Sequence, residues 1–203
     1  MAAVSFYPSI TTKQRSFFVS IKILGGVARG VTLVVPEGDV VRPTSVMIRR
    51  KIFDYYQSLE GTRFIDAFAG SGGMGLEAWS RGAEKLFFSE KNRKVSSVLK
   101  KNIEKIQERD TARTMQFFDG DFFSWAKYHQ AEFTENTIVF IDPPYMQHEC
   151  YKKVKEWLQN QDLRCEWWIE SDCHKGVPEK FWDDCGRVVK KKYEHGDSYL
   201  IIF

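Results

Sequence analysis

The sequence predicts an α/β fold built on one mostly parallel β-sheet, and three observations support this prediction. Apolar, β-rich runs alternate with helical patterns from Arg63 onward, as is typical of a parallel sheet with helices on both faces. A glycine-rich stretch follows the first of these runs. Hydrophobic residues make up 43% of the 203 residues, so one domain with a large buried core can form.

The segment before this alternation predicts a β-hairpin followed by a helix. Two β-rich runs within residues 18–36 are separated by glycines, which is a hairpin pattern. Apolar residues then recur at helical spacing from Ile48 to Leu59, and Thr44 or Ser45 can cap that helix. We therefore divide the chain into a flexible extension (1–17), a hairpin and helix (18–60) and an α/β domain (61–203).

The elements of the α/β segment follow one another in alternation. The predicted strands are rich in β-branched and aromatic residues and cover 63–68, 85–89, 114–118, 137–141 and 167–170. The predicted helices have apolar residues three or four positions apart and cover 74–81, 93–108, 122–129 and 149–159. Two last strands, 187–193 and 198–203, are separated by His195-Gly196-Asp197, so we expect them to form an antiparallel hairpin.

Charge is unevenly distributed along the chain. Residues 1–64 contain nine Lys or Arg and four Asp or Glu, whereas the remainder contains 21 and 23, within a total net charge of +3. Two interpretations of the basic front stay open, a surface that faces a polyanion and an ordinary solvated surface.

The cysteines and the hydropathy argue against several classes of protein. Cys150, Cys165, Cys173 and Cys185 show neither C-x-x-C spacing nor a histidine at a zinc-finger offset, so we expect free thiols and no metal site. No apolar run is long enough to span a membrane, and the first 20 residues lack the apolar core of a secretory signal. Those residues fit a plain extension or an organelle transit peptide. Because arginine is sparse there, we favour the extension and a cytoplasmic protein.

A cofactor site is predicted where the first strand of the alternation ends. The stretch DAFAGSGGMG, residues 66–75, lies between a predicted strand and a predicted helix. Gly70 and Gly72 allow the backbone to turn tightly and to approach a ligand. With Gly75 they also fit the G-x-G-x-x-G pattern, so a nicotinamide or flavin dinucleotide site is one alternative and a turn without ligand is another.

Acidic residues near the ends of the first three strands complete this prediction. Glu90 follows the second predicted strand, where its carboxylate can accept hydrogen bonds from both ribose hydroxyls of an adenosine. Asp121 lies just past the third strand and can accept the adenine amino group, with Phe122 against the ring. Asp66 precedes the glycines and can bind the methionine portion of S-adenosylmethionine, which favours that cofactor over a dinucleotide.

A candidate catalytic loop, Asp142-Pro143-Pro144-Tyr145, follows the fourth predicted strand. The prolines stiffen the backbone, and the Asp142 carboxylate and the Pro143 carbonyl can accept the two hydrogens of an amino group. These acceptors would aim an aromatic amine at a sulfonium methyl and stabilise the positive charge that develops on nitrogen. Tyr145 can stack on the base. The alternative is a rigid turn in which Tyr145 is an ordinary half-buried aromatic.

The two motifs together resemble class I S-adenosylmethionine-dependent amino-methyltransferases. From about Ile21 to Phe203 the chain is similar to the RsmD family of 16S rRNA guanine-N2 methyltransferases. The resemblance is to this family in particular because of residues in the N-terminal part of the chain. These residues are Gly25, Gly26, Arg29, Gly30, Leu33, Pro36, Arg42, Pro43, Thr44, Arg49 and Phe53. The chain departs from the family at Val46 and Arg50, where acidic residues are usual.

The resemblance implies a fold, a reaction and a set of site residues. The fold is a Rossmann-like, seven-stranded class I methyltransferase sheet that ends in an antiparallel hairpin. The reaction is methyl transfer from S-adenosylmethionine to a guanine N2 amino group in 16S rRNA or a small-subunit assembly. The basic N-terminal hairpin would help to bind the RNA. We expect a monomer. The predicted residues are Asp66, Phe68, Gly70, Gly72, Gly75, Glu90, Asp121 and Phe122 for the cofactor, Asp142, Pro143, Pro144 and Tyr145 for catalysis, and Lys22, Arg29, Arg42 and Arg49 for RNA.

Other functions stay open at this stage. An adenine-N6 or protein-amide methyltransferase can use the same loop, although 203 residues leave little room for a target-recognition domain. A dinucleotide-binding oxidoreductase and a non-catalytic RNA-binding module are the remaining alternatives. Trp167 and Trp168 are predicted core residues. We interpret Glu170 as a residue that ends their strand, with a supporting role at the active site as the alternative.

Overall fold

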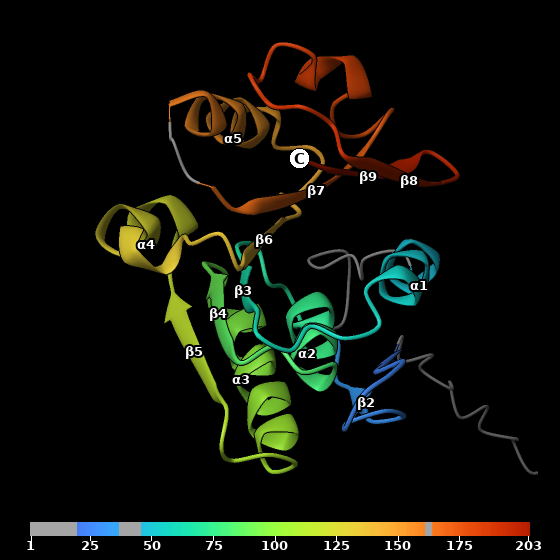
Figure 1. Cartoon of the computed structure of the whole chain (residues 1–203), viewed down its shortest axis with the longest axis vertical. Helices are drawn as coiled ribbons and strands as arrows, with labels where there is room; N and C mark the ends of the chain where they lie inside the picture. Colours follow the sequence, from blue (N-terminus) through green and yellow to red (C-terminus); the bar gives the residue numbers. More distant parts are fainter. Residues whose placement is uncertain (1–19, 37–45, 161–163) are drawn as a thin grey trace, which may run out of the picture.

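The computed structural model describes residues 20–36, 46–160 and 164–203. They form a seven-stranded sheet and a separate two-stranded sheet (Figure 1). The predicted extension, Arg42 and the candidate capping residues Thr44 and Ser45 lie outside the described residues.

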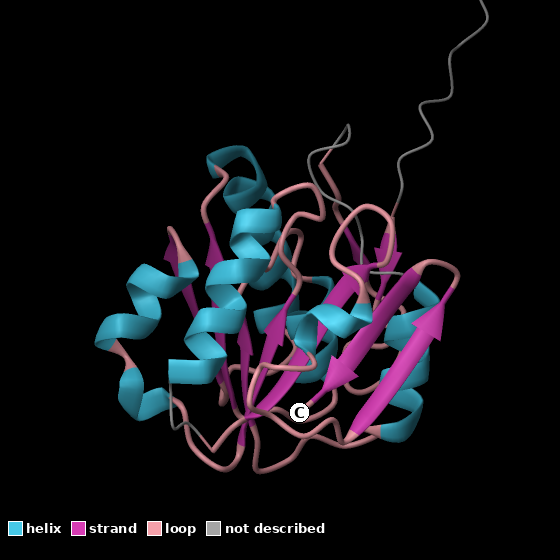
Figure 2. Ribbon diagram, turned by 90° about the horizontal axis from the view of Figure 1, so that it is seen from above, coloured by secondary structure: helices cyan, strands magenta, loops and turns pink. Residues whose placement is uncertain are grey.

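The seven-stranded sheet has the order β5-β4-β3-β6-β7-β9-β8. Its strands are β3 (Arg63–Asp66), β4 (Lys85–Glu90), β5 (Thr114–Asp119), β6 (Thr137–Ile141), β7 (Glu166–Asp172), β8 (Lys191–His195) and β9 (Ser198–Ile202). Strands β3 to β7 pair in parallel, whereas β9 runs antiparallel to both β7 and β8. This confirms the predicted Rossmann-like sheet with its terminal antiparallel hairpin, and Figure 2 shows the strands as one twisted sheet.

Three strands of this sheet are shorter than the sequence predicts, and the smallest difference is in β9, which ends at Ile202 rather than at residue 203. Strand β3 ends at Asp66 rather than at residue 68, because the chain turns there into the glycine-rich loop. Strand β8 begins at Lys191 rather than at residue 187. The register pairs Lys191 with Ile202, the last residue of β9. The Lys190 N–H still donates to the Ile202 carbonyl at 2.7 Å, but beyond that point β9 has no further residues with which 187–189 could pair. Val188 is accordingly 85% exposed.

The helices cover both faces of the sheet. They are α1 (Val46–Tyr55), α2 (Gly73–Ser80), α3 (Arg93–Gln107), α4 (Phe122–Tyr128) and α5 (His148–Asn160), with short 3₁₀ turns η1 (Gln130–Glu132) and η2 (Glu179–Trp182). Figure 1 shows α1, α2 and α3 on one side of the sheet and α4 and α5 on the other. Among the described helices, none combines the length and the apolar character needed to cross a membrane.

Helix α1 ends at Tyr55, although the apolar spacing extends to Leu59. The backbone N–H of Leu59 donates to the Arg81 carbonyl at 2.9 Å, and its side chain is only 2% exposed. A contact with the end of α2 therefore draws this residue out of the helix while keeping it in the core. Tertiary packing overrides the helical pattern here.

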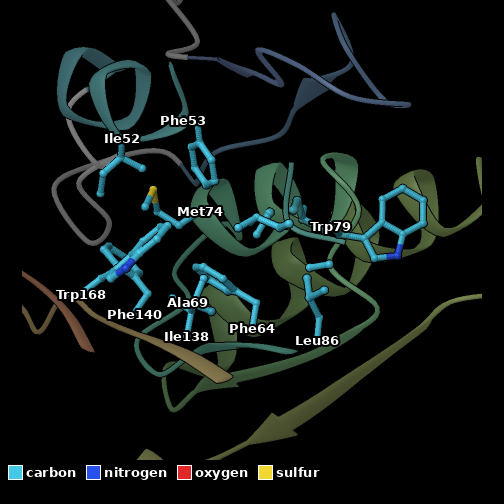
Figure 3. Packing of buried hydrophobic residues seen from close by; sticks show 14 of the residues in the cluster. Ile52, Phe53, Phe64, Ala69, Met74, Trp79, Leu86, Ile138, Phe140 and Trp168 are labelled. Atoms are coloured by element: carbon cyan, nitrogen blue, oxygen red, sulfur yellow. The ribbon is translucent and has the colours of Figure 1, made fainter. Parts of the chain in front are cut away.

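Two apolar clusters fill the space between the helices and the sheet. The cluster beneath α1, α2 and α3 includes Phe53, Trp79 and Trp168, and Figure 3 shows Phe53 and Ile52 of α1 above the strand residues Phe140 and Trp168. The cluster beneath α4 and α5 includes Trp167. Successive strand residues point to opposite faces of a sheet, so Trp167 and Trp168 pack into different clusters. The prediction that both are core residues is confirmed.

The N-terminal hairpin is confirmed, with strands of only two residues. Strand β1 (Ile21–Lys22) pairs antiparallel with β2 (Thr32–Leu33). The loop between them is held on α2 by buried polar groups. The Glu77 carboxylate accepts hydrogen bonds from the backbone N–H groups of Leu24 at 2.6 Å and Gly25 at 2.9 Å. Glu77 is fully buried and also accepts from Arg81 Nε at 2.8 Å, so one carboxylate joins the hairpin to α2.

Arg49 lies in this same interface and not on an RNA-facing surface. Its side chain is buried, at 1% exposure, and donates to the carbonyls of Lys22 at 2.9 Å and Gly73 at 3.3 Å. Burial lowers the pKa of the guanidinium, and the Glu77 charge opposes that shift. The prediction that Arg49 contacts RNA phosphates is therefore wrong, because packing of α1 against the hairpin buries this side chain.

Replacing Glu77 with Ala should lower the free energy of unfolding by about 3 kcal/mol, because it leaves buried hairpin N–H groups and Arg81 without their acceptor. Urea denaturation measures the change. The matched control is Glu84→Ala at an exposed position, where we expect a change within about 0.5 kcal/mol. Equal effects of the two substitutions would contradict a structural role for Glu77.

Candidate active site

A cavity of about 580 Å³ lies at the carboxyl ends of the parallel strands. Its wall comes from the glycine-rich loop after β3, the segment after β4, the start of α4 and the loop after β6. The predicted site residues on this wall are Asp66, Phe68, Gly70, Glu90, Asp121, Phe122, Asp142, Pro143, Pro144 and Tyr145. The residues predicted for cofactor and for catalysis therefore surround one space.

The predicted glycines of the loop and of the start of α2 have different structural roles. Gly70 lines the cavity and has a φ of 55°, a left-handed conformation that glycine adopts without strain. Gly72 and Gly75 do not lie on the cavity wall. A Cβ at Gly75 would stand 2.3 Å from the Phe88 ring. Glycine at this position thus lets α2 approach β4 closely, as in other close helix–strand contacts.

Asp66 is the most deeply buried acid at the cavity, with 1% exposure. Its Oδ2 accepts a hydrogen bond from the Gly75 N–H at 3.0 Å, whereas within the described part of the chain its buried Oδ1 has no hydrogen-bond partner. Burial raises the pKa of this carboxyl to about 7, the Gly75 N–H opposes the shift and the nearby Glu90 charge adds to it. A cation or a hydrogen-bond donor in the cavity would satisfy this oxygen.

Glu90 connects the glycine loop to the start of α3. Its Oε2 accepts from the Gly70 N–H at 3.0 Å and its Oε1 accepts from the Asn92 N–H at 2.7 Å. Each carboxylate oxygen has a further lone pair, so the predicted bonds to ribose hydroxyls are compatible with these contacts. Asn92 in turn caps α3 by accepting from the Lys94 N–H at 3.0 Å.

Asp121 and Phe122 form the start of α4 on the opposite wall. Asp121 caps the helix, with Oδ2 accepting from the Ser124 N–H at 3.0 Å. Phe122 is 1% exposed, and its ring lies 6.4 Å from that of Phe68, which also lines the cavity. An apolar edge therefore stands beside an acceptor, the arrangement predicted for an adenine pocket.

The loop after β6 is rigidly held by hydrogen bonds. The Pro143 carbonyl accepts from the Tyr151 hydroxyl of α5 at 3.1 Å, and the Pro144 carbonyl accepts from the Gln147 N–H at 2.8 Å. The Tyr145 hydroxyl donates to Glu170 Oε1 at 3.2 Å. Burial raises the pKa of Tyr145 above its usual value, and the charges of Asp142 and Glu170 raise it further. Tyr145 therefore remains a protonated donor.

Glu170 differs from its sequence-based interpretation as a strand-end residue. Strand β7 continues to Asp172, and Glu170 within it is fully buried. Because Ile141 pairs with Ile169, Glu170 and Asp142 directly follow register partners. The structure thus brings Glu170 beside the catalytic loop, in keeping with the alternative interpretation.

Several cavity residues were not predicted. Lys91 and Asn92 directly follow the end of β4, and Gln147 follows the catalytic loop, so a search of all residues after strand ends would have found them. Ile21 of β1 also lines the cavity. No local pattern marks Ile21, because only the docking of the hairpin on α2 brings it there.

The predicted RNA-binding residues have different environments. Lys22 and Arg29 are exposed on the hairpin, Arg49 is buried, and Arg42 lies outside the described residues. RNA binding by the exposed residues Lys22 and Arg29 stays a prediction.

Comparisons with known proteins identify the family. The family model described as conserved hypothetical protein 95 matches residues 21–201. The Escherichia coli K12 protein named ribosomal RNA small subunit methyltransferase D is 32% identical over 164 residues, which are 78% of each chain. The Haemophilus influenzae protein of the same name is 32% identical over 160 residues, 78% of this chain and 81% of that protein. The chain belongs to the RsmD family.

Solved structures agree with RsmD membership at the level of the fold. A hypothetical protein of Thermus thermophilus has a TM-score of 0.67 at 27% identity, over 90% of this chain and 98% of that one. The protein yhhF of Escherichia coli has a TM-score of 0.69 at 24% identity, over 91% and 97%. The RsmD match begins at residue 21 and thus includes the β1–β2 hairpin, so this hairpin belongs to the family's common structure.

Replacing Asp66 with Asn should change how stability depends on pH. With a pKa of about 7 in the folded protein and about 3.9 in the unfolded chain, the folded state holds an extra proton between these values. Wild-type stability should therefore fall between about pH 5 and about pH 7.5, relative to the variant, by about 2 to 3 kcal/mol. Urea denaturation of both proteins across this range tests it, and a constant difference between them would contradict the raised pKa.

Proposed function

We propose that this RsmD-family chain transfers a methyl group from S-adenosylmethionine to the N2 amino group of a guanine in 16S rRNA. One observation carries the proposal: Asp66, whose Oδ1 lacks a hydrogen-bond partner among the described residues, and the Asp142–Tyr145 loop line the same cavity. An acid suited to a cationic cofactor and a loop suited to an aromatic amine therefore meet in one site.

The residues of the cavity fit S-adenosylmethionine. Its amino-acid portion carries an ammonium group and its sulfur is a sulfonium, and both favour a site lined by carboxylates. Asp66 would hold the ammonium side, and Glu90 would hold the ribose. A dinucleotide would instead bring an anionic pyrophosphate against the glycine loop, beside the Asp66 carboxylate. Like charges would oppose that binding.

The catalytic loop would make a poor nucleophile react. The lone pair of an aromatic amine is delocalised into its ring, whereas the cofactor supplies a strongly electrophilic methyl group. The Asp142 carboxylate and the Pro143 carbonyl would accept the two amino hydrogens, aim the nitrogen and stabilise its developing positive charge. The Pro143 carbonyl already accepts from Tyr151, and its second lone pair leaves room for one more hydrogen bond.

The substrate assignment rests on the family and on the exposed charges of the hairpin. The RsmD relatives are named for the small-subunit ribosomal RNA, and Lys22 and Arg29 can bind phosphates without losing an internal partner in the described structure. We include in the proposal that the protein acts as a monomer in the cytoplasm, where its RNA substrate, free or in a small-subunit assembly, is accessible.

The proposal is tested by incubating the protein with methyl-labelled S-adenosylmethionine and small ribosomal subunits that lack the modification. Label in 16S rRNA that digests to N2-methylguanosine supports it. Label in N6-methyladenosine, or in a protein amide, would instead assign the loop to another amino group. Calorimetry with NAD and NADP covers the oxidoreductase alternative, since binding of either in preference to S-adenosylmethionine would overturn the cofactor assignment.

Replacing Asp142 with Ala should lower the rate of methyl transfer by about 100-fold or more, because the amino group keeps only one of its two acceptors. Affinity for S-adenosylmethionine, measured by calorimetry, should stay within about twofold. Asp183→Ala, at an exposed position beyond η2, serves as the control and should retain full activity. A collapse of cofactor affinity in the Asp142 variant would show that this division of roles is wrong.

Replacing Arg29 with Ala should weaken RNA binding and make it less sensitive to salt. For each phosphate that the variant no longer binds, the slope of log affinity against log salt concentration should decrease by about one unit. Filter binding across a salt series measures the slope. The control is Arg109→Ala, an exposed arginine in the loop before β5, at the sheet edge opposite the cavity. An unchanged slope for the Arg29 variant would exclude a phosphate contact.

A further inference from the structure

Glu170 is a buried acid that neither the cofactor site nor the proposed reaction uses. It has no exposed surface, and in β7 it lies between Ile169 and Ser171, which are also fully buried. Burying a carboxylate in the protein interior is costly. An apolar side chain of similar volume would pack here without that cost, so the carboxylate itself needs an explanation.

Its hydrogen bond connects it to the catalytic loop. Glu170 Oε1 accepts from the Tyr145 hydroxyl at 3.2 Å, and Tyr145 lines the cavity next to Asp142 and the two prolines. Glu170 follows Ile169, whose register partner Ile141 precedes Asp142. The charges of Asp142 and Glu170 both act on the Tyr145 hydroxyl, so the three groups form one cluster.

The geometry points to Glu170 as a positioning residue, which fixes the ring of Tyr145 on the cavity wall so that the target base stacks beside Asp142. This inference rests on the proposed function, in which Tyr145 stacks on the base. The prolines restrict the backbone of the loop, but they do not restrict the side-chain torsions of Tyr145. A bond from its hydroxyl to a buried, immobile carboxylate limits those torsions at the far end of the ring.

The consequence for the reaction is positional. A base that stacks on a fixed ring presents its amino group to the Asp142 and Pro143 acceptors in one orientation, and small displacements of reacting groups reduce rates strongly. RNA affinity depends mainly on backbone phosphates. Loss of the hydrogen bond between Tyr145 and Glu170 should therefore lower kcat and leave the KM for RNA nearly unchanged.

The test compares Tyr145→Phe, Glu170→Leu and Glu170→Gln with the wild type in steady-state methyl transfer. We expect the Phe and Leu variants to lose about ten- to 100-fold in kcat, the range for a hydrogen bond to a charged group. The double variant should be no slower than Tyr145→Phe, because that variant already removes the bond to Glu170 together with the hydroxyl's hydrogen bond to Ser198. Glu170→Gln retains an acceptor oxygen and should recover part of the rate.

The chain offers a matched control on the same strand. The Tyr56 hydroxyl donates to Glu166 Oε1 at 2.8 Å, at the amino end of β7 and so away from the cavity. Tyr56→Phe removes the same kind of bond and should leave kcat unchanged. Thermal unfolding and cofactor calorimetry on all variants separate loss of the Tyr145–Glu170 bond from loss of the fold.

The inference is overturned if Tyr145→Phe retains wild-type kcat, if the losses in the double variant multiply, or if Tyr56→Phe causes an equal loss. A crystal structure of Glu170→Leu gives a readout independent of activity, since an unmoved Tyr145 ring would also overturn it. Failure of the proposed function is distinguishable. In that case the wild type methylates another acceptor, and the same variants are compared on that acceptor.

Discussion

The parallel pairing of β3 with β4 and β6 is the constraint on which the site depends. Asp66, the last residue of β3, pairs with Phe88 on one side and Phe140 on the other. Glu90 and Asp142 each lie two residues beyond those partners. Because parallel strands end at the same edge of a sheet, three acids from distant parts of the sequence meet at one cavity, each at a turn where the backbone leaves the sheet.

Three buried carboxylates support the site in different ways. Asp66, Glu77 and Glu170 are almost completely excluded from solvent, although burial of a charge opposes folding. Each is held by a named donor: a backbone N–H of α2, the N–H groups of the hairpin, and the Tyr145 hydroxyl. The first faces the cavity, the second attaches the hairpin, and the third holds the catalytic loop. Burying each of these charges lowers stability, and each carboxylate holds a group whose position matters for the proposed function.

The N-terminal hairpin is part of the cavity wall as well as a carrier of exposed basic residues. Ile21 of β1 lines the cavity, and the next residue, Lys22, is exposed while its carbonyl accepts from Arg49. Arg49 also donates to Gly73, which lines the cavity at the start of α2. The surface proposed to bind RNA and the cavity wall proposed to bind the cofactor therefore include adjacent residues of β1, Lys22 and Ile21.

The sequence by itself determined the order and type of the elements, since the alternation of strand and helix patterns and the loops DAFAGSGG and DPPY depend on local chemistry. It also identified Asp66, Glu90 and Asp142, because acids directly after apolar strands mark the edge where ligands bind. Only the tertiary structure decided the end of α1, the environment of Arg49 and the contact of Glu170 with Tyr145. Charge and spacing in a sequence do not reveal which surfaces pack together, and the hydrogen bonds of Arg49 and Glu170 join residues 24 to 27 positions apart.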